Sequence, residues 1–114
     1  MYSVVDPSTG RTIQTYPTVT DEGLAAAVVQ ASQTFRTWSR TTTVAERAAL
    51  IAKVAELHLE RQDELAAIIS REMGKPTGDA VGEIQFSAAI YQFYADNAGA
   101  FLADEPIALM GGEG

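Results

Sequence analysis

Residues 64–86, ELAAIISREMGKPTGDAVGEIQF, determine how this chain folds, because they hold the end of one helix, a sharp stop and the start of another. Leu65, Ile68 and Ile69 recur at helical spacing. Gly74 can take the left-handed conformation that ends a helix, and Pro76 cannot continue one. The stretch therefore predicts two consecutive helices that meet at a tight corner.

Two helical regions are expected before this corner, over residues 21–38 and 44–73. The first follows Thr20, a suitable N-cap, and has acidic residues in its first turn. The second follows Thr43, which forms a capping box with Glu46. No apolar residue falls in the segment Glu60-Arg61-Gln62-Asp63, so this second region is predicted either to kink or to divide into two helices.

The helix after the corner is expected over residues 80–102 and is apolar on two faces. The faces consist of Ile84, Ala88, Tyr91 and Ala95 and of Phe86, Ile90, Phe93 and Phe101. A helix that is apolar on most sides is normally buried on most sides, and two other helices cannot easily enclose it. The chain is therefore expected to be a piece of a larger protein, or else to bury this helix in a homodimer.

A short β-hairpin is expected over residues 2–16. Asp6-Pro7-Ser8-Thr9-Gly10 lies between β-branched, alternating flanks. Asp and Pro open a turn, and Gly10 can close it at a positive φ. The segment 106–114 begins like a strand and stops. The predicted fold class is mainly α, with a short N-terminal β-hairpin and three to four helices.

The composition argues against several classes of function. The chain has 8 Lys and Arg against 15 Asp and Glu, a net charge of −7, which disfavours nucleic acid and anionic membranes as partners. It has no cysteine, and therefore no thiolate nucleophile or thiolate metal site. No stretch approaches the ~18 apolar residues of a membrane span. We expect a cytoplasmic protein with no membrane partner.

No residue pattern assembles a catalytic centre. His58, the only histidine, is expected to pack within a helix, because no catalytic partner lies at a suitable spacing. The acidic clusters at 60–64 and 72–83 are expected to form solvated faces. The glycine-rich segment 111–114 is not followed by the helix that a dinucleotide loop requires. We expect no catalytic and no cofactor-binding residue in this chain.

Four motifs, in order along the chain, resemble the N-terminal part of the aldehyde dehydrogenase superfamily. They are Asp6-Pro7-Ser8-Thr9-Gly10, Phe35-Arg36-Thr37-Trp38 with Glu46-Arg47, Glu72-Met73-Gly74-Lys75-Pro76 and Phe93-Tyr94-Ala95. The third motif and the segment Phe101-Leu102-Ala103-Asp104-Glu105-Pro106 are most similar to the succinate-semialdehyde dehydrogenase branch. The resemblance implies that residues 1–114 are the N-terminal part of an incomplete α/β cofactor-binding domain.

The family oxidises aldehydes to carboxylates with NAD or NADP and a catalytic cysteine. The resemblance implies that this cysteine and the cofactor motifs lie in the remainder of the polypeptide. The chain alone is therefore expected to be inactive and to hold no cofactor. The implied partners are that remainder and a small aldehyde, in a homodimer or homotetramer. The alternative is a small acidic helical interaction module, dimeric through the Phe86–Phe101 helix.

The resemblance also implies two sites within this chain. One is a monovalent-cation site formed by main-chain oxygens of Val4 and Val5 and by Glu72, since hard cations prefer oxygen ligands. The other is the mouth of the substrate tunnel, lined by Phe86 and by Ile90 one helical turn further on. The alternative for Phe86 and Ile90 is that both are simply core residues.

Overall fold

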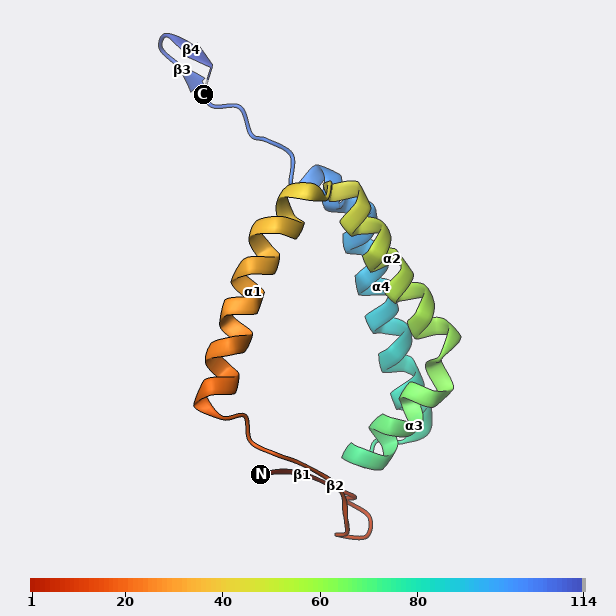
Figure 1. Ribbon diagram of the computed structural model, residues 1–114. Coiled ribbons are helices and arrows are strands. Elements are labelled where there is room, and N and C mark those ends of the chain that lie inside the picture. Colours follow the sequence, from red (N-terminus) through yellow and green to blue (C-terminus); the bar gives the residue numbers. More distant parts are fainter. Residues whose placement is uncertain (114) are drawn as a thin grey trace.

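The computed structural model describes residues 1–113 as four helices and two short hairpins (Figure 1). In chain order the elements are β1 (Tyr2–Val5), β2 (Thr12–Tyr16), α1 (Asp21–Thr41), α2 (Val44–Glu60), α3 (Gln62–Met73), α4 (Thr77–Phe101), β3 (Ala108–Leu109) and β4 (Gly112–Glu113). The predicted fold class, mainly α with an N-terminal hairpin, is confirmed. Gly114, the end of the predicted glycine-rich segment, lies outside the described residues.

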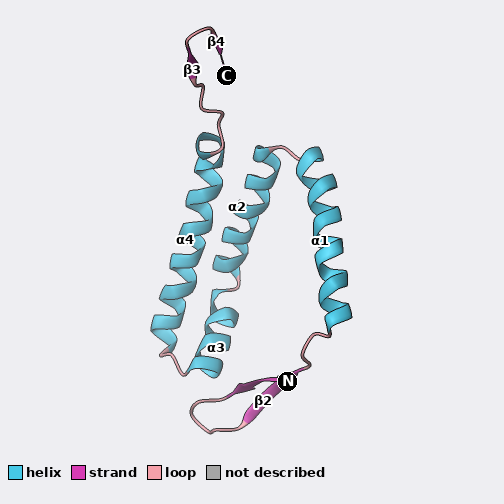
Figure 2. Ribbon diagram, turned by 90° about the vertical axis from the view of Figure 1, so that its left-hand side faces the viewer, coloured by secondary structure: helices cyan, strands magenta, loops and turns pink. Residues whose placement is uncertain are grey.

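The helices α2 and α3 run down one side of α4, which returns antiparallel to them (Figure 2). Their interface is a seam of small side chains. Its buried members are Ala55 of α2, Ala66 of α3, and Ala80, Ile84 and Ala88 of α4. Four of these five residues are alanines, which let the helix axes approach closely, and Ile84 is the one large apolar side chain buried among them. The first of the two predicted faces of α4 supplies Ile84 and Ala88.

Local sequence signals set the helix ends. Thr43 Oγ1 accepts a hydrogen bond from Glu46 N at 3.2 Å, and the Glu46 carboxylate accepts one from Thr43 N at 2.7 Å, which completes the predicted capping box. Thr20 Oγ1 accepts one from Gly23 N at 3.1 Å. Gly74 ends α3 with a φ of 71°. The predicted break near Arg61 separates α2 from α3.

Two helices are longer than the sequence predicts. α1 continues to Thr41 because threonine hydroxyls satisfy its last carbonyls: Thr42 Oγ1 donates to Trp38 O at 2.7 Å, and Thr41 Oγ1 to Thr37 O at 3.1 Å. α4 begins at Thr77 rather than near Ala80. Pro76 occupies its N-cap position, and the Pro76 carbonyl accepts a hydrogen bond from Ala80 N at 3.0 Å.

The helix α1 leans away from α2–α4 and buries none of its residues (Figures 1 and 2). Its connection to α2 is stabilised by Arg47, whose Nη1 donates to Thr42 O at 2.7 Å and whose Cζ lies 5.8 Å from the centroid of the Trp38 ring. The radius of gyration is 20.5 Å, against ~13 Å for a compact domain of similar length. The described chain is thus an open frame.

The N-terminal hairpin forms as predicted, with one irregularity. Asp6 caps its own turn, since its carboxylate accepts a hydrogen bond from Ser8 N at 2.8 Å, and Gly10 closes the loop with a φ of 69°. The strand register shifts between Val4 and Val5, so that Ile13 is the extra residue of a bulge in β2. The regular ladder is therefore interrupted beside the two valines.

The C-terminal segment differs from its prediction. Instead of one strand that stops, it forms a small antiparallel hairpin in which Ala108 pairs with Glu113 and Leu109 with Gly112. The turn falls at Met110–Gly111, and the hairpin projects away from the helices (Figure 1). Within residues 1–113, no helix combines the length and the apolarity needed to cross a membrane.

Candidate functional site

The second apolar face of α4 is exposed. Phe86 is 67% exposed and Ile90 is 41% exposed, although both are large apolar side chains. They line a shallow hollow of ≈ 390 Å³ together with Ala89, Phe93 and Tyr94. The two residues assigned to a tunnel mouth thus lie on one surface, with aromatic rings beside them.

The aromatic rings of this surface form a cluster near the end of α4. The ring centroids of Phe93 and Tyr94 are 5.4 Å apart, those of Phe93 and Phe101 6.0 Å, and those of Tyr94 and Phe101 6.2 Å. Edge and tilted arrangements at such distances are favourable. The cluster forms an apolar wall, and it offers little chemistry besides the Tyr94 hydroxyl.

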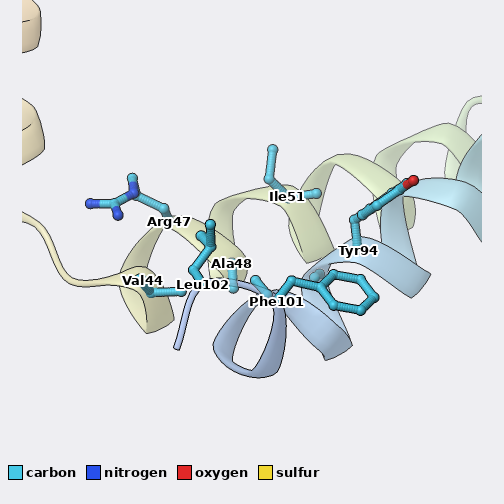
Figure 3. A pocket seen from close by; sticks show the side chains of 9 residues that line it. Val44, Arg47, Ala48, Ile51, Tyr94, Phe101 and Leu102 are labelled. Atoms are coloured by element: carbon cyan, nitrogen blue, oxygen red, sulfur yellow. The ribbon is translucent and has the colours of Figure 1, made fainter. Parts of the chain in front are cut away.

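A second hollow, of ≈ 410 Å³, lies where the start of α2 meets the end of α4 (Figure 3). It is lined by Val44, Arg47, Ala48, Ile51, Tyr94, Ala95, Ala98, Phe101 and Leu102. In Figure 3 the Arg47 side chain points away from Phe101 and Tyr94. The hollow is suited to receive apolar side chains and presents no nucleophile paired with a base.

The residues assigned to a cation site come from β1 and the last turn of α3. Glu72 is half-buried, and its Oε1 accepts a hydrogen bond from Arg71 Nη2 at 2.7 Å. Within residues 1–113 no three His, Cys, Asp or Glu side chains converge in a way that could hold a metal ion. A cation bound near Glu72 would therefore depend on main-chain oxygens, which Val4 and Val5 are expected to supply.

The loop of the first hairpin meets the end of α3. A Cβ placed on Gly74 would lie 3.0 Å from Pro7 Cγ and 3.7 Å from Pro7 Cβ. The proline ring therefore covers Gly74, two residues beyond Glu72. This contact was not anticipated from the sequence, because it joins two motifs that are far apart along the chain.

The remaining candidates have structural roles. His58 Nδ1 lies 2.8 Å from Val54 O, and its ring centroid lies 5.1 Å from that of Tyr91, which fits the expected packing role. Glu64 pairs with Arg61 at 2.7 Å, and this hydrogen bond from the guanidinium lowers the pKa of the Glu64 carboxyl. Glu83 pairs with Lys75 across the α3–α4 corner.

Comparison with known proteins identifies the class. The sequence pattern of the aldehyde dehydrogenase family matches residues 1–111, so the chain belongs to this family. The motif resemblance is thereby confirmed.

Several individual members of the family are similar to this chain over nearly its whole length. The succinate-semialdehyde dehydrogenase (NADP+) of Deinococcus radiodurans is 38% identical over 112 residues, which are 98% of this chain and 23% of that protein. The crystal structure of succinic semialdehyde dehydrogenase from Streptococcus pyogenes in complex with NADP+ has a TM-score of 0.90 and 31% identity, over 99% of this chain and 25% of that chain.

An NAD-dependent aldehyde dehydrogenase from Sinorhizobium meliloti also matches, with a TM-score of 0.84 and 38% identity, over 96% of this chain and 22% of that one. The chain thus spans about a quarter of the length of the relatives it matches. Relatives described with NADP and with NAD therefore both share the fold of this chain.

Proposed function

We propose that residues 1–114 form the N-terminal part of the cofactor-binding domain of an NADP-dependent succinate-semialdehyde dehydrogenase. The observation that carries this proposal is the TM-score of 0.90, over 99% of the chain, to a succinic semialdehyde dehydrogenase in complex with NADP+. The 38% identity to an NADP-dependent relative supports the same substrate and cofactor. We assign the enzyme to the cytoplasm, as a homodimer or homotetramer.

This segment contributes shape rather than reacting groups. It has no cysteine, so the nucleophile of the family must come from the rest of the polypeptide. NADP, when bound, supplies the hydride acceptor for oxidation of the aldehyde to the carboxylate. The open frame of α1, α2 and α4 offers exposed apolar side chains, such as Phe35 and Phe86, against which that remainder packs.

Phe86 and Ile90 are proposed to border the route of the aldehyde. Both are exposed on α4 and share a hollow with Phe93 and Tyr94. An apolar wall suits the methylene carbons of a short aldehyde, whereas its charged end needs a cationic partner. None of the residues that line this hollow is Lys or Arg, so we expect that partner to come from the remainder of the polypeptide.

Val4, Val5 and Glu72 are proposed to hold a monovalent cation. The donor set consists of two main-chain oxygens and a carboxylate, which suits a hard cation. The register shift in the hairpin falls at Val4 and Val5 and interrupts the ladder there. The Arg71–Glu72 pair is partly exposed, and exposed pairs contribute little, so it is a weak competitor for the carboxylate.

The function is tested by NADPH formation in the native polypeptide that carries this segment. Succinate semialdehyde is compared with butanal, which has a methyl group in place of the carboxylate, and NADP+ is compared with NAD+. We expect kcat/KM to be at least ~100-fold higher for succinate semialdehyde, because buried groups that bind a carboxylate are left unpaired by butanal.

Equal kcat/KM for the two aldehydes would overturn the proposed substrate, and a preference for NAD+ would overturn the proposed cofactor. If no aldehyde supports reduction of either cofactor, the enzymatic function itself is wrong.

A further inference from the structure

We propose that Trp38, Thr42 and Arg47 form a latch that sets the direction and the rotation of α1 relative to α2. The latch presents the apolar face of α1 to one partner, the remainder of the native polypeptide. The inference rests on the proposed function in this respect, since that function requires such a remainder. It gives a role to Trp38 and Arg47, which belong to the second of the four sequence motifs and which no part of the proposed chemistry uses.

The latch spans the short connection between α1 and α2. Arg47 Nη1 donates to Thr42 O at 2.7 Å and to Thr42 Oγ1 at 3.0 Å. Thr42 Oγ1 donates in turn to Trp38 O at 2.7 Å, and Arg47 Cζ lies 5.8 Å from the centroid of the Trp38 ring. The first turn of α2 is therefore joined to the last turn of α1 by hydrogen bonds and by a cation–π contact.

The charges at this connection suit the two helix ends that meet there. The last carbonyls of α1 carry a partial negative charge, and the first N–H groups of α2 carry a partial positive charge. The half-buried Arg47 guanidinium donates to the Thr42 carbonyl at the first of these ends, and the Glu46 carboxylate accepts from Thr43 N at the second. Hydrogen bonds to charged groups are the stronger ones, so each helix end is held firmly at the connection.

The position of α1 depends on this connection. The helix buries none of its residues, and within residues 1–113 it has no extensive packing against another helix (Figure 1). A helix of this length extends over ~30 Å, so that a tilt of ~10° at one end moves the other end by roughly 5 Å. A contact next to the pivot therefore controls where the far end of α1 lies.

The latch also sets which face of α1 is turned toward α2. Trp38 ends an apolar stripe on α1, whose other large members are Leu24, Val28 and Phe35. Because residues at this spacing share one face of a helix, the contact of Trp38 with Arg47 turns the whole stripe to that side. The stripe is exposed, with 70% for Phe35, and the chain spans only 25% of a solved relative. The remaining length of the polypeptide is therefore the partner that we assign to the stripe.

The test compares Arg47→Met with Arg40→Met in the native polypeptide. Methionine keeps an apolar stem at the hollow of Figure 3 and removes the charge and the donors. Arg40 is the matched control, because it is an exposed arginine in the last turn of α1. Hydrogen exchange, followed by mass spectrometry of peptides from each helix, measures local opening.

We expect Arg47→Met to accelerate exchange at least ~10-fold throughout α1, since hydrogen bonds to a charged group commonly contribute that factor or more. Exchange in α3 is expected to stay at the wild-type rate, as is exchange in α1 of Arg40→Met. If Arg47→Met does not fold, Thr42→Val, which removes the hydroxyl and little volume, is expected to accelerate exchange in α1 in the same pattern.

The ring of Trp38 is tested with two variants. Trp38→Phe keeps a ring for the guanidinium and is expected to stay closer to wild type than Trp38→Leu. Both Trp38→Leu and Arg47→Met break the same contact, so their effects are expected to be non-additive. Arg47→Met should therefore accelerate exchange in α1 by a smaller factor when combined with Trp38→Leu than it does alone.

Equal exchange in α1 of wild type and Arg47→Met would overturn the latch, as would equal acceleration in Arg47→Met and Arg40→Met. Acceleration confined to residues 42–47 would show that Arg47 stabilises only its own turn, which also contradicts the inference. Factors that multiply independently in the double variant would exclude a shared contact with Trp38. NADPH formation from succinate semialdehyde by the wild type decides the proposed function separately, because the exchange measurement uses no substrate.

Discussion

Glu46 lies in the first turn of α2, and its carboxylate accepts hydrogen bonds from both Thr43 N and Thr43 Oγ1, at 2.7 and 3.0 Å. These bonds hold the pKa of Glu46 below its ordinary value of 4.5, and the bond from the Thr43 backbone has the larger effect. The Asp6 carboxyl has a lowered pKa for a similar reason, through hydrogen bonds from Ser8. The start of a helix and the tip of a hairpin thus each depend on an ionised carboxylate.

The capping box predicts a pH dependence. Because the folded pKa of Glu46 lies below the unfolded one, its stabilisation is complete above pH 4.5 and is lost as the pH falls through the lowered folded value. Glu46→Gln removes this titration, so its Tm is expected to fall less steeply with acid than that of the wild type. Glu22→Gln is the control, since Glu22 is an exposed acid in the first turn of α1 and the cap of that helix is made by Thr20 and Gly23. Identical acid slopes for Glu46→Gln and wild type would contradict the prediction.

Phe86 provides a prediction about the substrate. Removing its exposed ring with Phe86→Ala opens the proposed tunnel wall, and we expect the kcat/KM of the enzyme for succinate semialdehyde to change by about tenfold, the effect of a modest change in an apolar pocket. Phe35→Ala is the matched control, because Phe35 is equally exposed but lies on α1. Steady-state kinetics that are unchanged in Phe86→Ala would argue against the tunnel.

Among the elements, α4 packs against its neighbours mainly through small residues. Ala80 is fully buried and Ala88 nearly so, and both lie on the face that packs against α2 and α3, whereas the aromatic face is open. We expect Ala88→Leu to destabilise the protein by about 1–3 kcal/mol, since a larger side chain at a tight interface forces the helices apart. Urea denaturation of the native polypeptide measures this. Ala100→Leu, at an exposed site of the same helix, is expected to cost less, and equal costs would show that the seam is not tight.

The elements also show what the sequence could predict. The starts of α1 and α2 and the stop at Gly74 follow from side chains within four residues of each end, so local reasoning found them. The alanine seam and the Pro7–Gly74 contact join residues distant in sequence, and no local signal marks them. The β3–β4 hairpin was missed because its strands contain only two residues each. Phe86 and Ile90 were assigned to the tunnel mouth through the family resemblance and not through periodicity, which is equally compatible with a place in the core.

At the scale of the whole molecule, the described chain is an open frame, 69 × 40 × 25 Å, with large apolar residues exposed on α1 and α4. Apolar surfaces of this kind normally contact another part of a protein. The frame has a TM-score of 0.90 to a chain of which it covers 25%. This supports the proposal that the remaining length of an aldehyde dehydrogenase packs against it.

The isolated chain of 114 residues is therefore expected to show no aldehyde-dependent NADPH formation and to bind a dye specific for apolar surfaces. The alternative, a helical module that dimerises through Phe86–Phe101, predicts a stable dimer with a cooperative thermal transition and little dye binding. Sedimentation equilibrium and a dye titration distinguish the two. A stable dimer that excludes the dye would contradict the exposed frame.

The most direct test of the central proposal is the intact mass of the native polypeptide from its source cell. We expect a product several times larger than the 12.2 kDa of this chain, as the coverage of only 23% of a relative indicates. A native product of 12.2 kDa would contradict the proposal that this chain is one segment of a complete dehydrogenase.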